Sequence, residues 1–496
     1  MFDFGMIQNA FVMFATWHNV LAIFSGMVIG VIVGCIPGMT GAMAVALVLP
    51  FTFHLSPLIA ILLLVSIYKG AIYGGSISAI LIKTPGTPAA AATVMDGYAL
   101  AEKGQAGKAL YMALYASAFA DFTSNLALIF FTGFIANFAL RFGPPEFFTL
   151  ICFALTVVAG VSEKSLAKGL ISAGMGLFLV SVGIDAVYGT ERFSFGNANL
   201  MAGLNFIPVL IGLFALPEIV ANCVETVKDY AKAADANDSR VTWADFKRCF
   251  KTILRGSAIG TVLGAIPGIG SAPSAFVAYG EARRHAKHPE TWGKGELEGV
   301  AAAESGNNGT CGSSLIPLLS LGVPGDAITG IILGAFMMHG LLPGPLLFQE
   351  NGTIVYALFM GIMLTSAMML LVGHFCIRSF AGITKIPKRI LFPAVLVLCF
   401  YGCYAINNSM FDVLVMTCIG GLGYLMNCWK IPVAPFVIAF VLGPLLEDNL
   451  RRSLLMSDGS YAIFLRSPIC WFFGAMFFVA LFYVYRQRRA ERKRVA

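Results

Sequence analysis

The chain has 496 residues, of which 58% are hydrophobic and 12% are charged, and its mean hydropathy is +0.81. A soluble globular domain is about 45–50% apolar and about a quarter charged, so the composition excludes a soluble protein. Apolar stretches suited to transmembrane helices, which need about 20 residues, recur along the chain without the alternation of β-barrel strands. We therefore expect an all-α polytopic membrane protein.

Residues 1–219 are predicted to form the first of two related halves. They contain Gly-Cys-Ile-Pro-Gly at 34–38, and then a Gly-rich turn, an apolar run and a Pro-Gly pair within 74–86. Proline removes a helix donor, and glycine adopts backbone angles that other residues avoid. The pattern predicts a re-entrant hairpin near 25–50 and a broken helix near 70–90.

The polar segment 220–255 is predicted to be a cytoplasmic linker with an arm helix. The second half, 256–485, repeats the order of the first, with Gly-Ala-Ile-Pro-Gly at 264–268 and a Gly-Ser-Ser to Val-Pro-Gly run at 312–325. It predicts a second hairpin near 256–280 and a second broken helix near 300–330. A basic tail follows at 486–496.

The basic residues predict how the halves are oriented. Lys and Arg number seven in 220–255, four in 281–298 and six in 486–496, and such segments stay in the cytoplasm. The hairpin at 256–280 then has both flanks on the cytoplasmic side, and arms of about twelve residues reach about 18 Å. The first hairpin has flanks without Lys or Arg, so it is expected to open to the periplasm. Opposed hairpins define an inverted repeat.

The breaks are also expected to mark the binding site. Freed backbone groups in hydrocarbon need partners, and transporters use such breaks to bind anionic groups and sodium ions. Close helix packing is the alternative role for any single small residue. A sodium site is placed near Asn307, Asn308 and Ser76. The full predicted substrate and ion set is Pro37, Gly38, Thr40, Gly75, Ser76, Ser78, Lys83, Thr84, Gly86, Thr87, Pro267, Gly268, Gly270, Ser271, Asn307, Asn308, Thr310, Ser313, Ser314, Gly325 and Asp326.

Charged residues in apolar zones are functional candidates. Lys83 either neutralises a substrate carboxylate or extends to the membrane interface. Glu304 is expected to be a structural partner or an ion-path residue rather than a catalytic acid. Asp121 is either functional or paired within the bundle. The cysteines have no metal-binding spacing, so no cofactor is expected apart from Na⁺ or H⁺ as a coupling ion.

The stretches 34–53, 73–110 and 264–330 resemble the large membrane subunit of the tripartite tricarboxylate transporters, the TctA family. The combination of GGS, TPGTP and DGY with NN and VPG is specific, and the resemblance covers nearly the whole chain. It implies an elevator-type secondary transporter, similar to the TRAP and ion transporter superfamily, in the bacterial inner membrane. Its partners would be a small TctB-like membrane subunit, a periplasmic TctC-like binding protein and membrane lipid. No nucleic-acid partner is expected.

The resemblance further implies import of tricarboxylates, dicarboxylates or related organic acids, driven by a sodium or proton gradient. The resemblance implies Asn or another uncharged residue at position 83, so Lys83 is a departure that could supply a fixed positive charge, either pairing a substrate carboxylate or replacing one cation. Two other functions remain as alternatives, a stand-alone transporter or channel, and an intramembrane serine protease. The protease would need a base near the serines of 74–76 or 312–314, and His339 is the nearest histidine in sequence. An enzyme is not expected.

Overall fold

The protein is described by a computed structural model covering residues 4–161, 165–185, 189–224, 240–383 and 388–495. Within these residues, six helices (α2, α4, α6, α18, α20 and α21) are long and apolar enough to cross a membrane, which agrees with the expected helical polytopic membrane protein. One short antiparallel pair, β1 (Gly183–Ile184) and β2 (Glu191–Arg192), places Gly183 opposite Arg192.

The helices follow the chain in this order: α1 Phe4–Phe14, α2 Trp17–Cys35, α3 Gly41–Val48, η1 Leu49–His54, α4 Pro57–Ile82, η2 Pro88–Ala91, α5 Thr93–Glu102, α6 Ala106–Ala139, α7 Pro144–Val161, α8 Leu166–Val180, α9 Ala198–Met201, α10 Phe206–Phe214, α11 Leu216–Val224, α12 Trp243–Gly264, α13 Ser271–Arg284, η3 Pro289–Thr291, α14 Leu297–Ser313, α15 Leu315–Leu321, α16 Ala327–Met338, α17 Leu347–Glu350, α18 Gly352–Ile383, α19 Lys388–Asn407, α20 Met410–Cys428, α21 Val433–Leu455, η4 Tyr461–Leu465 and α22 Pro468–Val495.

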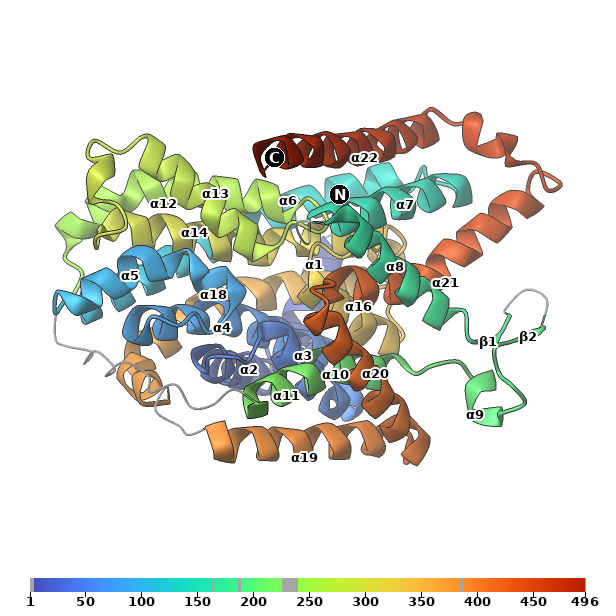
Figure 1. Ribbon diagram of the computed structural model, residues 1–496, viewed down its shortest axis with the longest axis horizontal. Helices are drawn as coiled ribbons and strands as arrows, with labels where there is room; N and C mark the ends of the chain where they lie inside the picture. Colours follow the sequence, from blue (N-terminus) through green and yellow to red (C-terminus); the bar gives the residue numbers. More distant parts are fainter. Residues whose placement is uncertain (1–3, 162–164, 186–188, 225–239, 384–387, 496) are drawn as a thin grey trace.

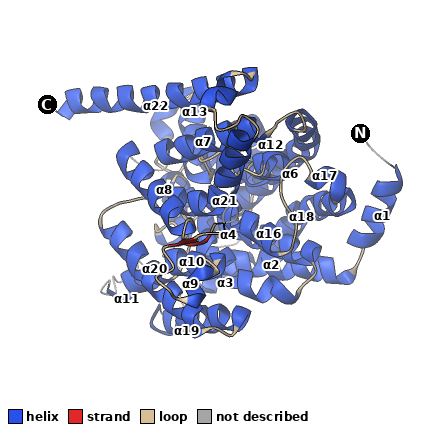
Figure 2. Ribbon diagram, turned by 90° about the vertical axis from the view of Figure 1, so that its right-hand side faces the viewer, coloured by secondary structure: helices blue, strands red, loops and turns tan. Residues whose placement is uncertain are grey.

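The helices pack as two groups. In the core bundle, α2 packs along α4, α12 packs along α14, and the long helices α6 and α18 join these pairs. In the outer bundle, α7 and α8 pack with α21 and α22, while α10 and α11 pack with α19 and α20. The members of the outer bundle lie along the upper right and lower edges of the molecule in Figure 1, and α22 extends away from the body in Figure 2.

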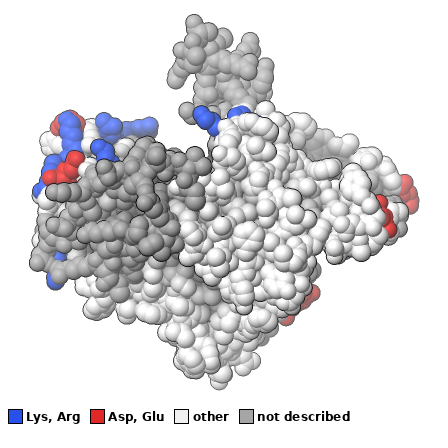
Figure 3. Space-filling view, turned by 60° about the horizontal axis from the view of Figure 1, so that its bottom comes forward, with Lys and Arg blue, Asp and Glu red and all other residues white. Residues whose placement is uncertain are grey.

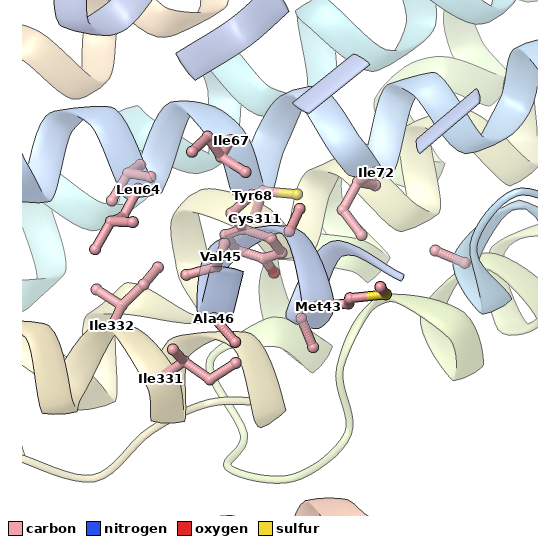
Figure 4. Close-up of a cluster of buried hydrophobic side chains, with 14 of the residues drawn as sticks. Met43, Val45, Ala46, Leu64, Ile67, Tyr68, Ile72, Cys311, Ile331 and Ile332 are labelled. Atoms are coloured by element: carbon pink, nitrogen blue, oxygen red, sulfur yellow. The ribbon is translucent and has the colours of Figure 1, made fainter. Parts of the chain in front are cut away.

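The short helices α3 and α16 connect the two bundles. Helix α3 contacts α4 and α10, and α16 contacts α4 and α21. Figure 4 shows their aliphatic side chains, Val45 and Ala46 from α3 and Ile331 and Ile332 from α16, packed beside Tyr68 of α4. Helix α4 is buried on all sides, as expected for a helix that is apolar around its whole circumference.

The two Ile-Pro-Gly segments are breaks between helices, and their glycines have positive φ, +91° at Gly38 and +89° at Gly268. The expected length of about twelve residues is wrong for the arm before Pro267, since α12 has 22 residues, and α2, which precedes Pro37, has 19. The glycines Gly26, Gly30 and Gly34 do not shorten α2, because they face α4 so closely that a Cβ would overlap its backbone. Small residues serve such close packing.

The Gly-rich turn expected at 74–76 is also wrong, because α4 continues through it to Ile82. A Cβ at Gly74 would overlap the Val31 backbone in α2, so this glycine serves helix packing. The chain leaves the helix at Lys83 and resumes at η2 and α5. In the second half, α14 and α15 meet at Ser314, and Gly322 ends α15 with φ +71°.

The polar linker is described in part. Helix α11 ends at Val224, and α12 begins at Trp243 behind a capping box formed by Thr242 and Asp245. Most of the expected arm helix, residues 225–239, lies outside the described residues. The predicted basic tail is the continuation of α22.

Candidate functional site

Glu304 of α14 is the centre of a buried polar cluster, the Glu304 cluster. Its side chain is 0% exposed. Its Oε1 accepts hydrogen bonds from Ser76 of α4 (2.5 Å) and from Thr93 of α5, and its Oε2 accepts one from Ser117 of α6 (2.9 Å). Three helices and α14 itself therefore converge on one carboxylate, and no described cationic side chain forms an ion pair with it.

Two asparagines extend this cluster toward the first break. The Asn308 amide donates to Ser117 Oγ (2.9 Å) and to Asn307 Oδ1 (2.6 Å). Among the described residues, the buried oxygens Asn308 Oδ1, Thr87 Oγ1 and Tyr73 OH have no hydrogen-bond partner. Buried polar groups normally have one. A carboxylate surrounded by hydroxyl and amide oxygens is suited to a hard cation or a proton.

A second buried cluster, the Lys69 cluster, joins α4, α6 and α18. Lys69 Nζ lies 2.9 Å from Asp121 Oδ1, and it donates to Asn125 Oδ1 (2.8 Å) and Thr365 Oγ1 (2.9 Å). Ser366 donates to Asp121 Oδ2 (2.6 Å). Both charged side chains are 0% exposed. Removing one partner of such a pair costs about 3–5 kcal/mol, because the other charge stays buried.

The second break is tied to α4 through Asp326 and to its own hairpin through Gly325. Tyr68 donates to Asp326 Oδ2 (2.7 Å), while Asp326 Oδ1 accepts from the backbone N–H of Thr329 (2.8 Å) and so caps α16. The Gly268 N–H donates to the Gly325 carbonyl (2.7 Å). In the first half, Gly86 lies so close to the Gly34 carbonyl that a Cβ would overlap it. Each Pro-Gly break therefore rests on the hairpin of its own half.

The tips of both hairpins contact the outer bundle. A Cβ built on Gly38 would lie 2.6 Å from the side chain of Asn222 in α11, and one on Gly268 would lie 2.7 Å from Val158 in α7. Glycine at each tip thus permits both the positive φ and the close approach.

Asp96 of α5 holds the start of α14. Its Oδ1 accepts hydrogen bonds from the backbone N–H groups of Gly293 (2.8 Å), Gly295 (2.9 Å) and Glu296 (2.8 Å), and its Oδ2 accepts one from Tyr279 (2.7 Å). A carboxylate is a strong acceptor for such amides. This contact joins the segment after the first break to the loop between α13 and α14.

Residues 20–438 match the family described as Tripartite tricarboxylate transporter TctA family. The chain belongs to this family. It is 37% identical over 451 residues, 91% of this chain and 90% of the relative, to the "Uncharacterized 52.8 kDa protein in TAR-I ttuC' 3'region" of Agrobacterium vitis. A second relative there, the "Uncharacterized protein in TAR-II ttuC' 3'region", is 36% identical over 210 residues, 42% of this chain and 87% of the relative. No solved structure matches.

Membership of the TctA family makes the chain a transmembrane subunit of a tripartite tricarboxylate transporter and not an enzyme. The serine protease alternative is therefore rejected. The Ser76 hydroxyl donates to Glu304, and Ser314 lies beside Tyr68 (3.4 Å) rather than a histidine.

The structure brings together part of the predicted site. Ser76, Asn307 and Asn308 lie in the Glu304 cluster, with Thr87 packed against Gly75. Residues on both sides of the second break gather around Asp326, namely Ser314, Gly325, Gly268 and Gly270.

Other predicted site hydroxyls bond locally. Those of Ser78, Thr84, Thr310 and Ser313 donate to backbone carbonyls two to four residues earlier, and Thr40 caps α3. Ser271 is the first residue of α13, and Pro37 and Pro267 lie in the hairpin turns.

Lys83 lies outside both polar clusters. It is exposed, it ends α4 in the left-handed conformation with φ 59°, and its ammonium lies 5.1 Å from the centre of the Tyr98 ring. Asparagine tolerates this conformation better than lysine. The local backbone thus favours asparagine over lysine at this position.

Several site residues were not predicted: Lys69, Tyr68, Thr93, Ser117, Asn125, Thr365 and Ser366. One signal could have revealed part of the set, since Ser117, Asp121 and Asn125 are spaced four apart on an apolar helix and so share a face. Lys69, a single charge in the middle of an apolar stretch, was another such signal. For Asp121, the structure supports pairing within the bundle.

Proposed function

We propose that the chain is the large subunit of a cation-coupled symporter that imports di- or tricarboxylates or related organic acids. The Glu304 cluster carries this proposal. It is a fully buried carboxylate without a cationic partner among the described residues, and unpartnered oxygens of Asn308 and Thr87 are buried nearby. A carboxylate in such surroundings is stable only when it takes up a cation or a proton, so Na⁺ or H⁺ is the proposed coupling ion.

We propose that the substrate carboxylate binds beside the two breaks. Backbone N–H groups at the start of helices α3, α5, α13 and α16 follow the breaks, and helix N-termini favour anionic groups. The family supplies the substrate class.

We propose two inverted repeats and an elevator-type movement. The packing of the long helices supports the repeat, because α6 of the first half packs on α12 and α14, while α18 of the second half packs on α2 and α4. The two hairpin tips both face the outer bundle, Gly38 at α11 and Gly268 at α7. In this proposal, the core bundle carries the site along a scaffold formed by the outer bundle.

The proposed orientation follows the charges. Lys and Arg gather mainly at the left end of the molecule in Figure 3, whereas the right-hand end displays Asp and Glu. By the positive-inside rule the basic end faces the cytoplasm, together with the C-terminus. A periplasmic TctC-like binding protein would then deliver substrate at the opposite end, and a small TctB-like subunit would complete the complex in the bacterial inner membrane.

Uptake by the reconstituted three-component system tests the proposal. Labelled citrate and dicarboxylates would be supplied with a sodium gradient, with a pH gradient, or with neither. We expect uptake that requires one of these gradients and is lost in Glu304→Gln. The matched control is Glu298→Gln, which changes a partly exposed carboxylate on the same helix. Gradient-independent uptake, or equal loss in both variants, would contradict the proposal.

A further inference from the structure

The surroundings of the Lys69 ammonium are those of a bound metal cation. Four oxygens surround Nζ: Asp121 Oδ1 at 2.9 Å and Oδ2 at 3.1 Å, Asn125 Oδ1 at 2.8 Å, and Thr365 Oγ1 at 2.9 Å. An ammonium has only three hydrogens to donate. Carboxylate, amide and hydroxyl oxygens are also the ligands that hard cations prefer.

The three groups that carry these oxygens are held in place by contacts that do not involve Lys69, Asp121 through its Oδ2, while Asp121 Oδ1 has no hydrogen-bond partner among the described residues. The Thr365 hydroxyl donates to the Ile362 carbonyl (2.6 Å), which leaves its lone pairs directed toward Nζ. The Asn125 amide donates to the same carbonyl (3.1 Å) and to Ser366 Oγ (2.9 Å), so its oxygen faces Nζ. Ser366 in turn donates to Asp121. The acceptors therefore form a preorganised cage around a positive charge.

The cage lies in the middle of three candidate membrane spans. Lys69 is twelve residues after Pro57 and thirteen before Ile82, so it is about 18–20 Å from either end of α4 at 1.5 Å per residue. Asp121 and Thr365 lie near the centres of α6 and α18. Both charged side chains are fully buried there, and an ionised carboxylate so placed needs a positive partner.

Asp121 and Glu304, two of the buried carboxylates, differ in their cationic partners. Ser117, which donates to Glu304, precedes Asp121 by one turn on the same face of α6. Both carboxylates accept from hydroxyl groups and have an asparagine nearby. Asp121 has a lysine at contact distance, whereas Glu304 has no cationic partner among the described residues.

We propose that Asp121, Asn125 and Thr365 form a monovalent-cation site that Lys69 fills with its own ammonium. On the proposed function, the exchangeable coupling cation then binds only at the Glu304 cluster. The Lys69 ammonium occupies the site formed by Asp121, Asn125 and Thr365, so this site binds no sodium in the wild-type chain. Removal of the ammonium makes the site available to a sodium ion.

Binding of ²²Na⁺ to the purified full-length chain tests this inference. We expect Lys69→Ala to bind one more saturable Na⁺ per chain than wild type, with competition by Li⁺ but not by choline. The double variant Lys69→Ala/Asp121→Asn should return to the wild-type count. Lys103→Ala, which removes an exposed lysine of the same chain, is the control and should leave the count unchanged.

Several results would decide the matter. An unchanged count in Lys69→Ala overturns the inference. The inference is also overturned if, with sodium present throughout purification, the double variant is recovered folded but Lys69→Ala is not. In that case Asp121 has failed to bind a sodium ion in place of the ammonium. If neither variant folds with sodium present throughout purification, the inference is overturned as well, because a sodium ion bound by Asp121, Asn125 and Thr365 should replace the charge that Lys69 supplies. Binding in Lys69→Ala but not in wild type supports the inference and instead contradicts sodium coupling at Glu304.

Discussion

Replacement of Asp96 by alanine removes the acceptor for four hydrogen bonds in one step. The N–H groups of Gly293, Gly295 and Glu296 and the hydroxyl of Tyr279 then lose their partner. An unsatisfied buried group costs about 1–3 kcal/mol. Because Gly293 is exposed and Gly295 half-buried, water can replace part of the loss, and we expect a total below the sum for four fully buried groups, about 3 kcal/mol.

This change is measurable as a shift in thermal midpoint. With a melting entropy of about 2.1 cal/mol/K per residue, a chain of this length shifts by about 3 °C for 3 kcal/mol. A thiol-reactive dye reports unfolding in detergent, because Cys249 and Cys311 are buried in the folded chain. Asp96→Asn keeps the Oδ1 acceptor and Tyr279→Phe removes one hydrogen bond, so each should lower the midpoint by about 1 °C.

The order of these variants is the decisive result. If Asp96→Ala unfolds within 1 °C of wild type, the amides have found other acceptors and the proposed role of Asp96 is wrong. If Asp96→Asn is as damaging as Asp96→Ala, the negative charge rather than the acceptor geometry holds the start of α14.

Three further predictions concern the break residues and the first turn of α12. Lys83→Asn should raise the free energy of unfolding by about 0.5 kcal/mol, because Asn suits the left-handed backbone conformation at this position. Uptake should be unchanged. A higher KM or altered ion coupling would instead support a substrate contact for this lysine. Gly38→Ala and Gly268→Ala should each lower uptake at least several-fold while Gly133→Ala, where a Cβ meets nothing within 4 Å, stays at wild-type rate. Desolvation raises the pKa of Asp245, but hydrogen bonds from Lys108 and Thr242 outweigh it and lower this pKa to about 2. The ionised carboxylate therefore stabilises the fold fully above about pH 4, and this stabilisation is lost as the pH falls through 2. The thermal midpoint of Asp245→Asn should accordingly fall less than that of wild type in an acid titration.

The sequence was sufficient to predict the helical membrane class, the positions of both Ile-Pro-Gly breaks and part of the Glu304 cluster. Pro-Gly at a helix end is a local signal, because proline and glycine restrict or free the backbone wherever they stand. A glycine without a neighbouring proline does not predict a helix end in the same way. Gly74 in α4 and Gly38 at a hairpin tip look alike in sequence, yet the first serves helix packing and the second a turn.

The partners of buried charges could not be predicted for a different reason. Lys69 and Asp121 are 52 positions apart, and Thr365 is 296 positions from Lys69. Periodicity shows which side of a helix a residue occupies, but the facing helix follows from the packing of the whole bundle. The same applies to Ser117, whose partner Glu304 belongs to the other half of the chain.

Polar contacts within the core bundle differ from the contacts between the two bundles, and this difference bears on the proposed movement. Inside the core bundle, the clusters of Lys69 and Glu304 fix helix positions through short directional bonds, and sliding one helix by a turn would leave charges buried and unpaired. Between the bundles, α16 instead meets aliphatic and aromatic groups, Gly330 beside Ile438 and Gly334 against Phe206. Apolar contacts are non-directional, so they can re-form after a shift at small cost. These contacts therefore support the proposed elevator movement, which would preserve the core bundle and change its contacts with the outer bundle.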